Sequence, residues 1–336
     1  MLSNIERKNI KKKNYNVNNS LKIFNLNNLQ ILNIKGPDSK IFLQNQLTIN
    51  INKLDNNNYL NALHCNSQGR ILTNMHIFKN SNNYYKYIIQ KNILEIYLKN
   101  IKKYTSLYNI KIFLDSRETI FGLSSKNLKK IVSEIFKKNN VLLKNKTLFF
   151  FKKDIFLKFC YSNYYYFLVL SKKNIKFFMQ EFYSKKIIYT INNNIWNEFY
   201  MKIGYPIIDI NHNCNLFFPQ QSNMETFNAI DFNKGCYLGQ EIISTLKFKN
   251  NKNKTLFLLE GKTNFLPLFN DLLEIQNNKT KKWQIIRGSI ILKSLILKSN
   301  LIWIQVILKN NILKNSLIRL NKDKKSIFSI IKIFNN

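Results

Sequence analysis

The chain has 336 residues, of which 45% are hydrophobic and 14% aromatic, and its formal net charge is +35. This hydrophobic content excludes wholesale disorder, and the length predicts two or three compact units. No CxxC pair occurs among the four cysteines, Cys65, Cys160, Cys214 and Cys236. Their spacing excludes a disulfide framework or a zinc ribbon and favours a reducing cytoplasm. We therefore expect a cytoplasmic protein with several hydrophobic cores.

The positive charge has two interpretations. Lys and Arg number 53 against 18 Asp and Glu, and such a balance attracts polyanions such as RNA. The chain also has only 8 Gly and 4 Pro and is rich in Lys, Asn and Ile, which is typical of an AT-rich genome. Because we expect the lysines to be spread along the whole chain rather than clustered, we interpret the charge as mostly compositional, with an RNA affinity left open. Lysines interrupt the most apolar stretch, residues 290–308, so no membrane span is expected.

Residues 1–20 are basic and rich in Asn, and they predict a solvated tail. Strands are predicted over residues 21–26 and 29–34, joined by Asn27-Asn28 as a β-hairpin. A helix is predicted to start at Gly36-Pro37-Asp38-Ser39, with Pro in its first turn and side-chain acceptors as its cap. The next predicted elements are strands at 59–65, 70–79 and 84–90 and a helix at 93–107.

The second half of the chain changes character near residue 255. Before that point, strands are predicted at 110–114, 119–123, 148–151, 155–159 and 165–170, with helices at 127–138 and near 175–183. Because strands and helices mix without a regular βαβ alternation, we predict an α+β fold. From residue 255 onward, short strands and turns predict a small C-terminal barrel.

Residues 234–241, Lys-Gly-Cys-Tyr-Leu-Gly-Gln-Glu, are the strongest candidate for a functional site. Two of the eight glycines, Gly235 and Gly239, flank Cys236 here, and glycine serves where φ is positive or where another group approaches the backbone closely. Lys234 places a positive charge near the thiol, which favours the thiolate. A small buried cysteine is the competing interpretation. From the residues alone, both roles stay open.

Other chemistry receives little support. The sequence contains no GxxxxGK[ST], no GxGxxG after a strand and no GxSxG. Adjacent strand residues point to opposite faces of a sheet, so His64-Cys65 is a poor metal pair. We predict no metal site.

The segment around Cys236 closely resembles the signature of the YgfZ-type folate-binding, tRNA-modifying proteins. Their K-G-C-[FY]-x-G-Q-E core matches residues 234–241 in full, and Pro219-Gln220 and Asn223 precede it as in the family. Residues 204–209 (GYPIID) resemble the family's G-x-P-x-x-D segment. Residues 42–48 (FLQNQLT) and 62–70 (ALHCNSQGR) resemble its two N-terminal blocks. The resemblance covers about residues 21 to 335.

The resemblance implies the fold of the aminomethyltransferase (glycine cleavage T-protein) relatives. This is an α+β fold with a ferredoxin-like unit and a C-terminal β-barrel around a central folate site. On this basis we divide the chain into three parts. They are a basic tail at 1–20, a folate-binding α+β core at 21–245 with a ferredoxin-like subdomain at about 110–190, and a C-terminal β-barrel at 246–336.

The resemblance also implies a function. The family's ligand is tetrahydrofolate, and its roles are support of methylthio-type tRNA modification, maintenance of iron–sulfur enzymes and an influence on replication initiation. The leading interpretation is a monomeric accessory protein, not a classical enzyme, with Cys236 as key residue and with tRNA-modifying iron–sulfur enzymes and tRNA as partners. Two alternatives stay open: a tetrahydrofolate-dependent aminomethyl or one-carbon transferase, and a basic RNA-binding module with a decayed folate site.

The residues that carry over give a mixed result. The family uses two tryptophans at the folate site; Trp196 matches the second, and Leu29 stands in place of the first. Lys202 stands where folate-binding relatives usually place an acid, and lysine offers only donors to the pterin edge. The remaining motif positions all match: Gly235, Tyr237, Gly239, Gln240 and Glu241. We therefore expect an intact cysteine motif beside a weakened folate site.

Overall fold

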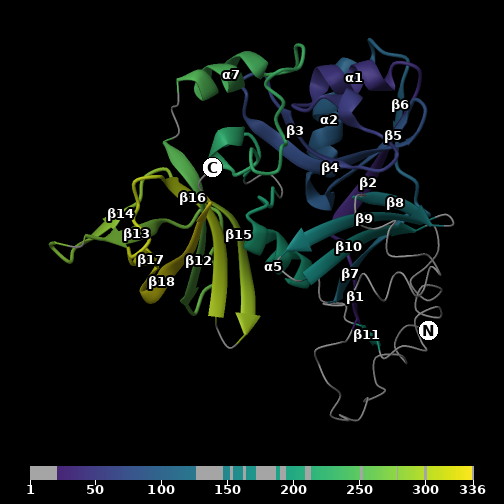
Figure 1. The fold of residues 1–336 in the computed structure, drawn as a ribbon. Helices are drawn as coiled ribbons and strands as arrows, with labels where there is room; N and C mark the ends of the chain where they lie inside the picture. Colours follow the sequence, from purple (N-terminus) through teal and green to yellow (C-terminus); the bar gives the residue numbers. More distant parts are fainter. Residues whose placement is uncertain are drawn as a thin grey trace.

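The computed structural model describes residues 21–125, 147–151, 154–161, 164–171, 187–189, 194–208, 213–249, 253–277, 279–298 and 301–334. Within these ranges the strands form three sheets (Figure 1). The five-stranded sheet and its helices lie at the upper right of Figure 1, the six-stranded sheet lies below it, and the barrel strands lie on the other side. The predicted α+β fold class is confirmed.

The five-stranded sheet and two helices form what we call the N-terminal unit. The strands are antiparallel in the order β3-β4-β5-β2-β6. Their bounds are β2 Leu29–Lys35, β3 Leu60–Cys65, β4 Ile71–Ser81, β5 Tyr84–Gln90 and β6 Lys111–Phe113. The helices are α1 (Ser39–Gln46) and α2 (Leu94–Thr105), and each buries one apolar stripe in a shared core, for example Phe42 of α1 and Tyr97 of α2.

The six-stranded sheet has the order β11-β1-β7-β10-β9-β8. Its strands are β1 Leu21–Asn25, β7 Thr119–Ser125, β8 Leu148–Phe151, β9 Asp154–Tyr161, β10 Tyr164–Ser171 and β11 Ile187–Tyr189. Helix α5 (Asn194–Ile203) follows it and packs toward the barrel strand β15 (Figure 1). This helix carries Trp196 and Lys202, two residues of the predicted folate site.

The C-terminal part forms a seven-stranded antiparallel sheet in the order β14-β13-β17-β18-β12-β16-β15. The strands are β12 Lys254–Lys262, β13 Leu273–Gln276, β14 Trp283–Ile285, β15 Ile290–Lys298, β16 Leu301–Lys309, β17 Ile318–Leu320 and β18 Asp323–Phe334. Along β18, buried and exposed residues largely alternate, as expected for a strand with one face on a core. Strands follow from residue 254 as predicted, but they are not all short: β12, β15 and β16 have 9 residues each and β18 has 12.

The predicted hairpin of the first two strands is wrong. Strand β1 pairs with β7 and β11, whereas β2 pairs with β5 and β6, so the strands belong to different sheets. The Asn27-Asn28 turn does form, with the Leu29 N–H donating to the Leu26 carbonyl at 3.0 Å. Because each strand is already paired along both edges, neither has a free edge for the other. The turn therefore passes the chain from one sheet to the next.

Helix α1 begins as predicted near residue 38, but its cap differs. Asp38 occupies the N-cap position without a side-chain bond to the helix. Its carboxylate instead accepts from the Asn109 N–H at 2.7 Å and ties the helix start to the segment before β6. Pro37 precedes the cap rather than lying in the first turn. The predicted helices at 127–138 and near 175–183 lie outside the described residues.

The predicted domain boundaries stay predictions. Strand β1 joins the sheet formed by residues 119–189, so that sheet extends beyond the predicted subdomain at about 110–190. In the part of the chain that the structure describes, no helix is long and apolar enough to cross a membrane.

Candidate functional site

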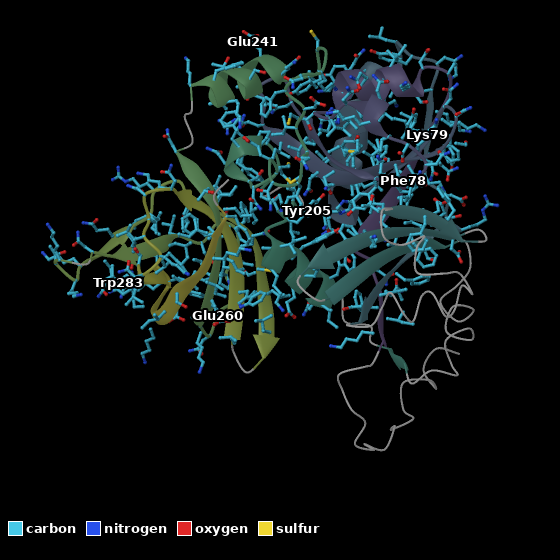
Figure 2. The ribbon with its side chains drawn as sticks, viewed as in Figure 1. Phe78, Lys79, Tyr205, Glu241, Glu260 and Trp283 are labelled. Carbon is cyan, nitrogen blue, oxygen red and sulfur yellow. The ribbon has the colours of Figure 1, made fainter. Side chains whose placement is uncertain are left out.

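The Lys234–Glu241 motif forms the loop that leads into helix α7 (Gln240–Phe248). Figure 1 shows α7 at the top of the molecule, beside α1 of the N-terminal unit. Figure 2 shows Glu241 at the outer edge of α7. As an acid in the first turn, Glu241 suits the positive end of the helix dipole. We call residues 234–239 the cysteine loop.

Lys234 anchors the cysteine loop to the N-terminal unit. Its side-chain ammonium donates to the carbonyls of Gln44 at 2.5 Å, Leu47 at 2.7 Å and Ile49 at 2.9 Å. These carbonyls lie at and after the C-terminal end of α1, where helix carbonyls lack internal partners and the dipole is negative. Burial lowers the pKa of Lys234 to about 8, an effect that nearby Asp231 opposes.

The three protons of a lysine ammonium allow three hydrogen bonds, and Lys234 donates all three to carbonyls. None is left to donate to a thiolate at Cys236. The predicted role of Lys234 in favouring that thiolate therefore has no hydrogen bond behind it and stays a prediction. What the structure does show is a positioning role for the loop.

The Gln240 side chain bonds to the backbone of the cysteine loop at two places. Its amide oxygen accepts from the Tyr237 N–H at 3.2 Å, and its amide nitrogen donates to the Lys234 carbonyl at 3.4 Å. The Leu238 N–H donates to the Asn45 carbonyl at 3.0 Å, which adds a second link to α1. The Tyr237 ring is buried, and the Lys234 ammonium lies 4.9 Å from its centroid. The loop is thus fixed on both sides of Cys236.

The two glycines of the loop differ in their roles. Gly239 has φ +81°, and a Cβ there would lie 2.4 Å from the Asn66 carbonyl oxygen and 3.0 Å from the Gly69 Cα. Any larger residue would therefore clash with the backbone of the β3–β4 turn. A Cβ on Gly235 would meet no atom within 4 Å. Close approach explains Gly239 and leaves Gly235 without a steric reason.

Cys236 is exposed, unlike buried Cys65 and half-buried Cys214. Its neighbours Lys234 and Tyr237 are both buried. The loop therefore presents one thiol to solvent from a backbone that the rest of the motif holds in place. Such a thiol can attack an electrophile, bind a soft metal or exchange with another sulfur.

The other blocks of the predicted signature meet at the same place. From the first N-terminal block, the Thr48 carbonyl accepts from the Asp231 N–H at 2.8 Å, and the Thr48 hydroxyl donates to the Ala229 carbonyl. Gln220 donates to the Ile243 carbonyl of α7 at 2.7 Å, and Asn223 donates to the Gly204 carbonyl at 3.1 Å. These polar side chains hold separate segments of backbone together around the loop. Asp209, the last residue of the 204–209 segment, lies outside the described residues.

The predicted folate residues are packed into a core. Trp196 has 0% of its surface exposed, and its ring lies against four others: Phe24, Phe159, Phe199 and Tyr200. Leu29 is 7% exposed and belongs to the same core cluster. In this arrangement the Trp196 ring has no open face on which a pterin could stack. A stacking role needs these rings to move, and it stays a prediction.

Lys202 also has partners in place. It forms an ion pair at 2.5 Å with Glu198, one turn earlier on α5, and its ammonium lies 5.4 Å from the centroid of Trp303 in the barrel. The Trp303 indole N–H donates to Glu260 at 2.8 Å. Position 202 thus has no acid, and the carboxylate nearby on α5, Glu198, is paired with Lys202. As they stand, these residues do not fit the acceptor role expected toward a pterin.

A buried histidine network was missed by the sequence reasoning. His76 lies 2.8 Å from the Asn61 amide oxygen through Nδ1 and 2.7 Å from the Tyr200 hydroxyl through Nε2. Asn61 donates its NH₂ to the Phe227 carbonyl, so its oxygen faces the ring and Nδ1 carries the proton. Tyr205 stacks on His76 at 4.9 Å, and Figure 2 places Tyr205 where the three sheets approach each other. Burial lowers the pKa of His76 to about 3.

His64 and Cys65 lie on opposite faces of β3, as predicted. His64 packs edge-on against Tyr97 in the N-terminal core, whereas Cys65 belongs to the central cluster with Trp196. Burial lowers the pKa of His64 to about 4 and raises the pKa of the Cys65 thiol. Among the described residues, no group of three His, Cys, Asp or Glu side chains is placed to hold a metal ion.

The arrangement of the three sheets defines the fold class of the protein. The solved structure of the glycine cleavage system aminomethyltransferase T from Bartonella henselae matches this chain with a TM-score of 0.74. The match covers 94% of this chain and 86% of that chain at 9% sequence identity. The chain therefore has the aminomethyltransferase fold, as predicted.

Sequence comparison then identifies the family. A family model for the YgfZ beta-barrel domain matches residues 251–323. The tRNA-modifying protein YgfZ of Buchnera aphidicola subsp. Schizaphis graminum is 34% identical over 259 residues, which cover 75% of this chain and 77% of that protein. The tRNA-modifying protein YgfZ of Blochmanniella pennsylvanica is 30% identical over 281 residues, 82% of each chain. The chain belongs to the YgfZ family.

Proposed function

We propose that this chain supports tRNA modification and that the Cys236 thiol is the group through which it acts. The proposal rests on a contrast in burial and bonding between Cys236 and the other residues of its loop. Lys234, Tyr237, Gly239 and Gln240 are committed to the surrounding structure, and Cys236 is exposed. Relatives of this family are described as tRNA-modifying proteins, which supplies the biological process.

The surroundings of the thiol favour an accessory role over a classical enzyme. Within the described ranges, no side chain hydrogen-bonds the Cys236 thiol. A cysteine nucleophile usually has a positioned base within hydrogen-bond reach. Because Cys236 has no such base among the described residues, we expect the reacting groups to be supplied by a partner protein that docks against the cysteine loop.

Complementation tests this proposal. In a strain that lacks its own copy of the gene, Cys236→Ala should restore less than about a tenth of the methylthio-type tRNA modification that the unaltered chain restores, measured by nucleoside mass spectrometry. Because the Cys236 side chain is exposed, the variant should unfold at the same denaturant concentration as the parent. Cys214→Ala is the matched control, since it also removes one thiol and should restore the modification. Full restoration by Cys236→Ala would end the proposal.

Iron–sulfur enzymes are the partner class that this proposal predicts. Thiolates are soft ligands suited to iron–sulfur clusters, so an exposed thiol on a fixed loop can approach such a cluster. In the same strain, cluster occupancy of the methylthiolating enzyme should fall with Cys236→Ala and not with Cys214→Ala. Equal cluster occupancy with the Cys236→Ala and Cys214→Ala variants would contradict the proposed link to iron–sulfur enzymes. The influence on replication initiation stays a prediction, with no feature of the described structure behind it.

Tetrahydrofolate also stays a prediction for this chain. The aminomethyltransferase fold supports it, whereas Leu29, enclosed Trp196 and the Lys202–Glu198 pair weigh against tight binding and against the transferase alternative. A Trp283→Phe/Trp303→Phe variant leaves Trp196 as the one tryptophan. Quenching of its emission by micromolar tetrahydrofolate would show that the ring cluster opens to a pterin. No quenching at millimolar ligand would remove folate from the proposal.

A further inference from the structure

The positive charge of the chain is not evenly spread, and the expectation that it would be is wrong for one segment. Residues 194–250, which include the cysteine loop, contain 4 Lys and Arg and 5 Asp and Glu. Residues 251–336 contain 16 Lys and Arg and 4 Asp and Glu. The barrel is therefore strongly basic, and the segment that carries Cys236 is close to neutral.

A pocket of about 540 Å³ opens at one end of the barrel, a volume in the range of small-ligand sites. It lies between the β13–β14 hairpin, the residues after β14 and the loop after β16. Three cations, Lys279, Arg287 and Lys309, line it together with exposed Ile285. No Asp or Glu is among its lining residues.

The lining groups are available to a ligand. All three cations are exposed, and within the described part of the chain none forms an ion pair. Ile285 and Leu313 are 47% and 61% exposed, which leaves apolar surface inside a basic pocket. Gln284 and Asn311 add amide groups, which can both donate and accept at a base edge. Cations, apolar surface and amides together match a nucleotide.

A line of cations connects the pocket to the cysteine loop. Lys309 is the register partner of Lys254 at the start of β12, and Lys254 donates to the Gly288 carbonyl at 2.6 Å, next to Arg287. Beyond Lys254, the 3₁₀ turn Pro219–Gln221 packs on β12, and Arg70 lies 4.9 Å from the centroid of Phe218 beside that turn. Burial lowers the pKa of Lys254, and the positive charges of Lys309 and Arg70 lower it further.

Arg70 brings this line to the cysteine loop. It follows Gly69, the residue against which Gly239 packs. Like charges that lie together favour the binding of an anion with repeated charges. In Figure 1, α7 lies above the start of β12, and the β13–β14 hairpin projects to the side of the barrel.

We propose that the barrel-end pocket binds one nucleotide of a single-stranded RNA segment. Ile285 and Leu313 contact its base, and Lys279, Arg287 and Lys309 contact its phosphates. Lys254 and Arg70 contact the phosphates of the adjoining nucleotides, so that the RNA backbone runs from the pocket toward Cys236. This inference rests on the proposed function, which identifies the RNA as tRNA.

Fluorescence anisotropy with a labelled tRNA transcript and with a labelled single-stranded heptaribonucleotide tests the pocket. The Arg287→Gln/Lys309→Gln variant should bind the heptamer about tenfold more weakly than the parent at 150 mM salt. Its slope of log K against log salt should be shallower by about 1.4, since each lost phosphate contact on a single strand accounts for about 0.7. Lys262→Gln/Lys325→Gln removes the same charge from barrel positions outside the pocket and should change the affinity less than twofold. Leu313→Ser should weaken binding without changing the slope, because it removes base contact alone.

A labelled polyglutamate peptide is measured in the same assay. Three results would overturn the proposal: equal losses of RNA binding in both double variants, no RNA binding by the parent chain, or an Arg287→Gln/Lys309→Gln variant that loses polyglutamate binding and keeps RNA binding. The first would show that charge acts over the whole surface, and the last would indicate an acidic polypeptide as the ligand. The Cys236→Ala complementation is independent of these results. If it still abolishes modification, the proposed function stands and only the RNA pocket falls.

Discussion

The cysteine loop and the barrel-end pocket use their lysines in opposite ways. Lys234 is 7% exposed, and its three donors are bonded to backbone carbonyls. Lys279 and Lys309 are exposed and, within the described residues, have no acidic partner. Net charge alone therefore does not identify a binding surface in a chain this basic. What distinguishes the two regions is whether the side-chain donors are already used.

The same two regions differ in how acid should affect them. All three histidines precede residue 213, and the two described ones are buried beside or within the N-terminal unit. The barrel has none and depends on carboxylates such as Glu274. Burial alone would raise the pKa of Glu274, but hydrogen bonds from Lys324, Arg319 and Asn321 outweigh it and lower the pKa to about 2.

Mild acid gives the largest expected effect. His64 and His76 have folded pKa values of about 4 and about 3, below the unfolded value of about 6.5, so the unfolded chain binds more protons between these limits. Stability is therefore lost as the pH falls below 6.5. From pH 7.5 to pH 5 the loss is about 2 kcal/mol for each histidine, about 4 kcal/mol together. Urea unfolding at both pH values measures it.

The barrel should follow at lower pH. Its Glu274 contribution is present above the unfolded pKa of about 4.3 and is lost as the pH falls toward 2. A variant with Trp196 alone reports on the core, and a variant with Trp283 alone reports on the barrel, because Arg319 lies 4.2 Å from the centroid of Trp283 and bonds Glu274. A Trp283 signal that changes before the Trp196 signal between pH 6.5 and pH 4.5 would show that the barrel is the more acid-sensitive region.

Gly239→Ala should have the next largest effect, a loss of about 3 kcal/mol. The substitution adds strain at φ +81° and a backbone clash at 2.4 Å. Gly235→Ala is the matched control in the same loop, because its Cβ meets nothing within 4 Å, and it should change stability by less than about 0.5 kcal/mol. Denaturant unfolding of both variants measures the difference. Equal losses would show that the β3–β4 turn does not constrain the loop.

Lys234→Met should cost about 2 kcal/mol. The change removes three charge-assisted hydrogen bonds at the end of α1, and the relief of burying an ammonium offsets part of the loss. Lys249→Met, on an exposed lysine just after α7, is the control and should change stability by less than about 0.5 kcal/mol. Thermal and urea unfolding check the pair. An unchanged Lys234→Met protein would mean that the lysine is not an anchor.

Local pattern predicted much of this fold. The strands predicted at 59–65 and 70–79 match β3 and β4, and the helix predicted at 93–107 matches α2. The same signals failed at Asn27-Asn28. A turn signal specifies the turn but not which strands continue from it, and that choice depends on partners at residues 84–90 and 187–189.

The cysteine motif was visible in the sequence, whereas its support was not. The partners of Lys234 are carbonyls of Gln44, Leu47 and Ile49, and every residue type offers a carbonyl, so no side-chain pattern could mark them. The contacts that enclose Trp196 likewise come from separate segments. His76 carried only a weak signal, a histidine between Met75 and Ile77 in a predicted strand.

The pairing of β1 with β11 has a consequence for synthesis. Strand β1 leaves the ribosome before its parallel partner at Ile187–Tyr189, which follows more than 160 residues later. Synthesis adds about 5 to 20 residues per second, so one edge of β1 stays unpaired for roughly 10 to 30 seconds before β11 is made. This holds even after β7 has paired with the other edge. An edge left open for that time is a place where nascent chains can pair with each other. Slow closure of this sheet therefore makes the β1 edge a site where a chaperone can protect the newborn chain.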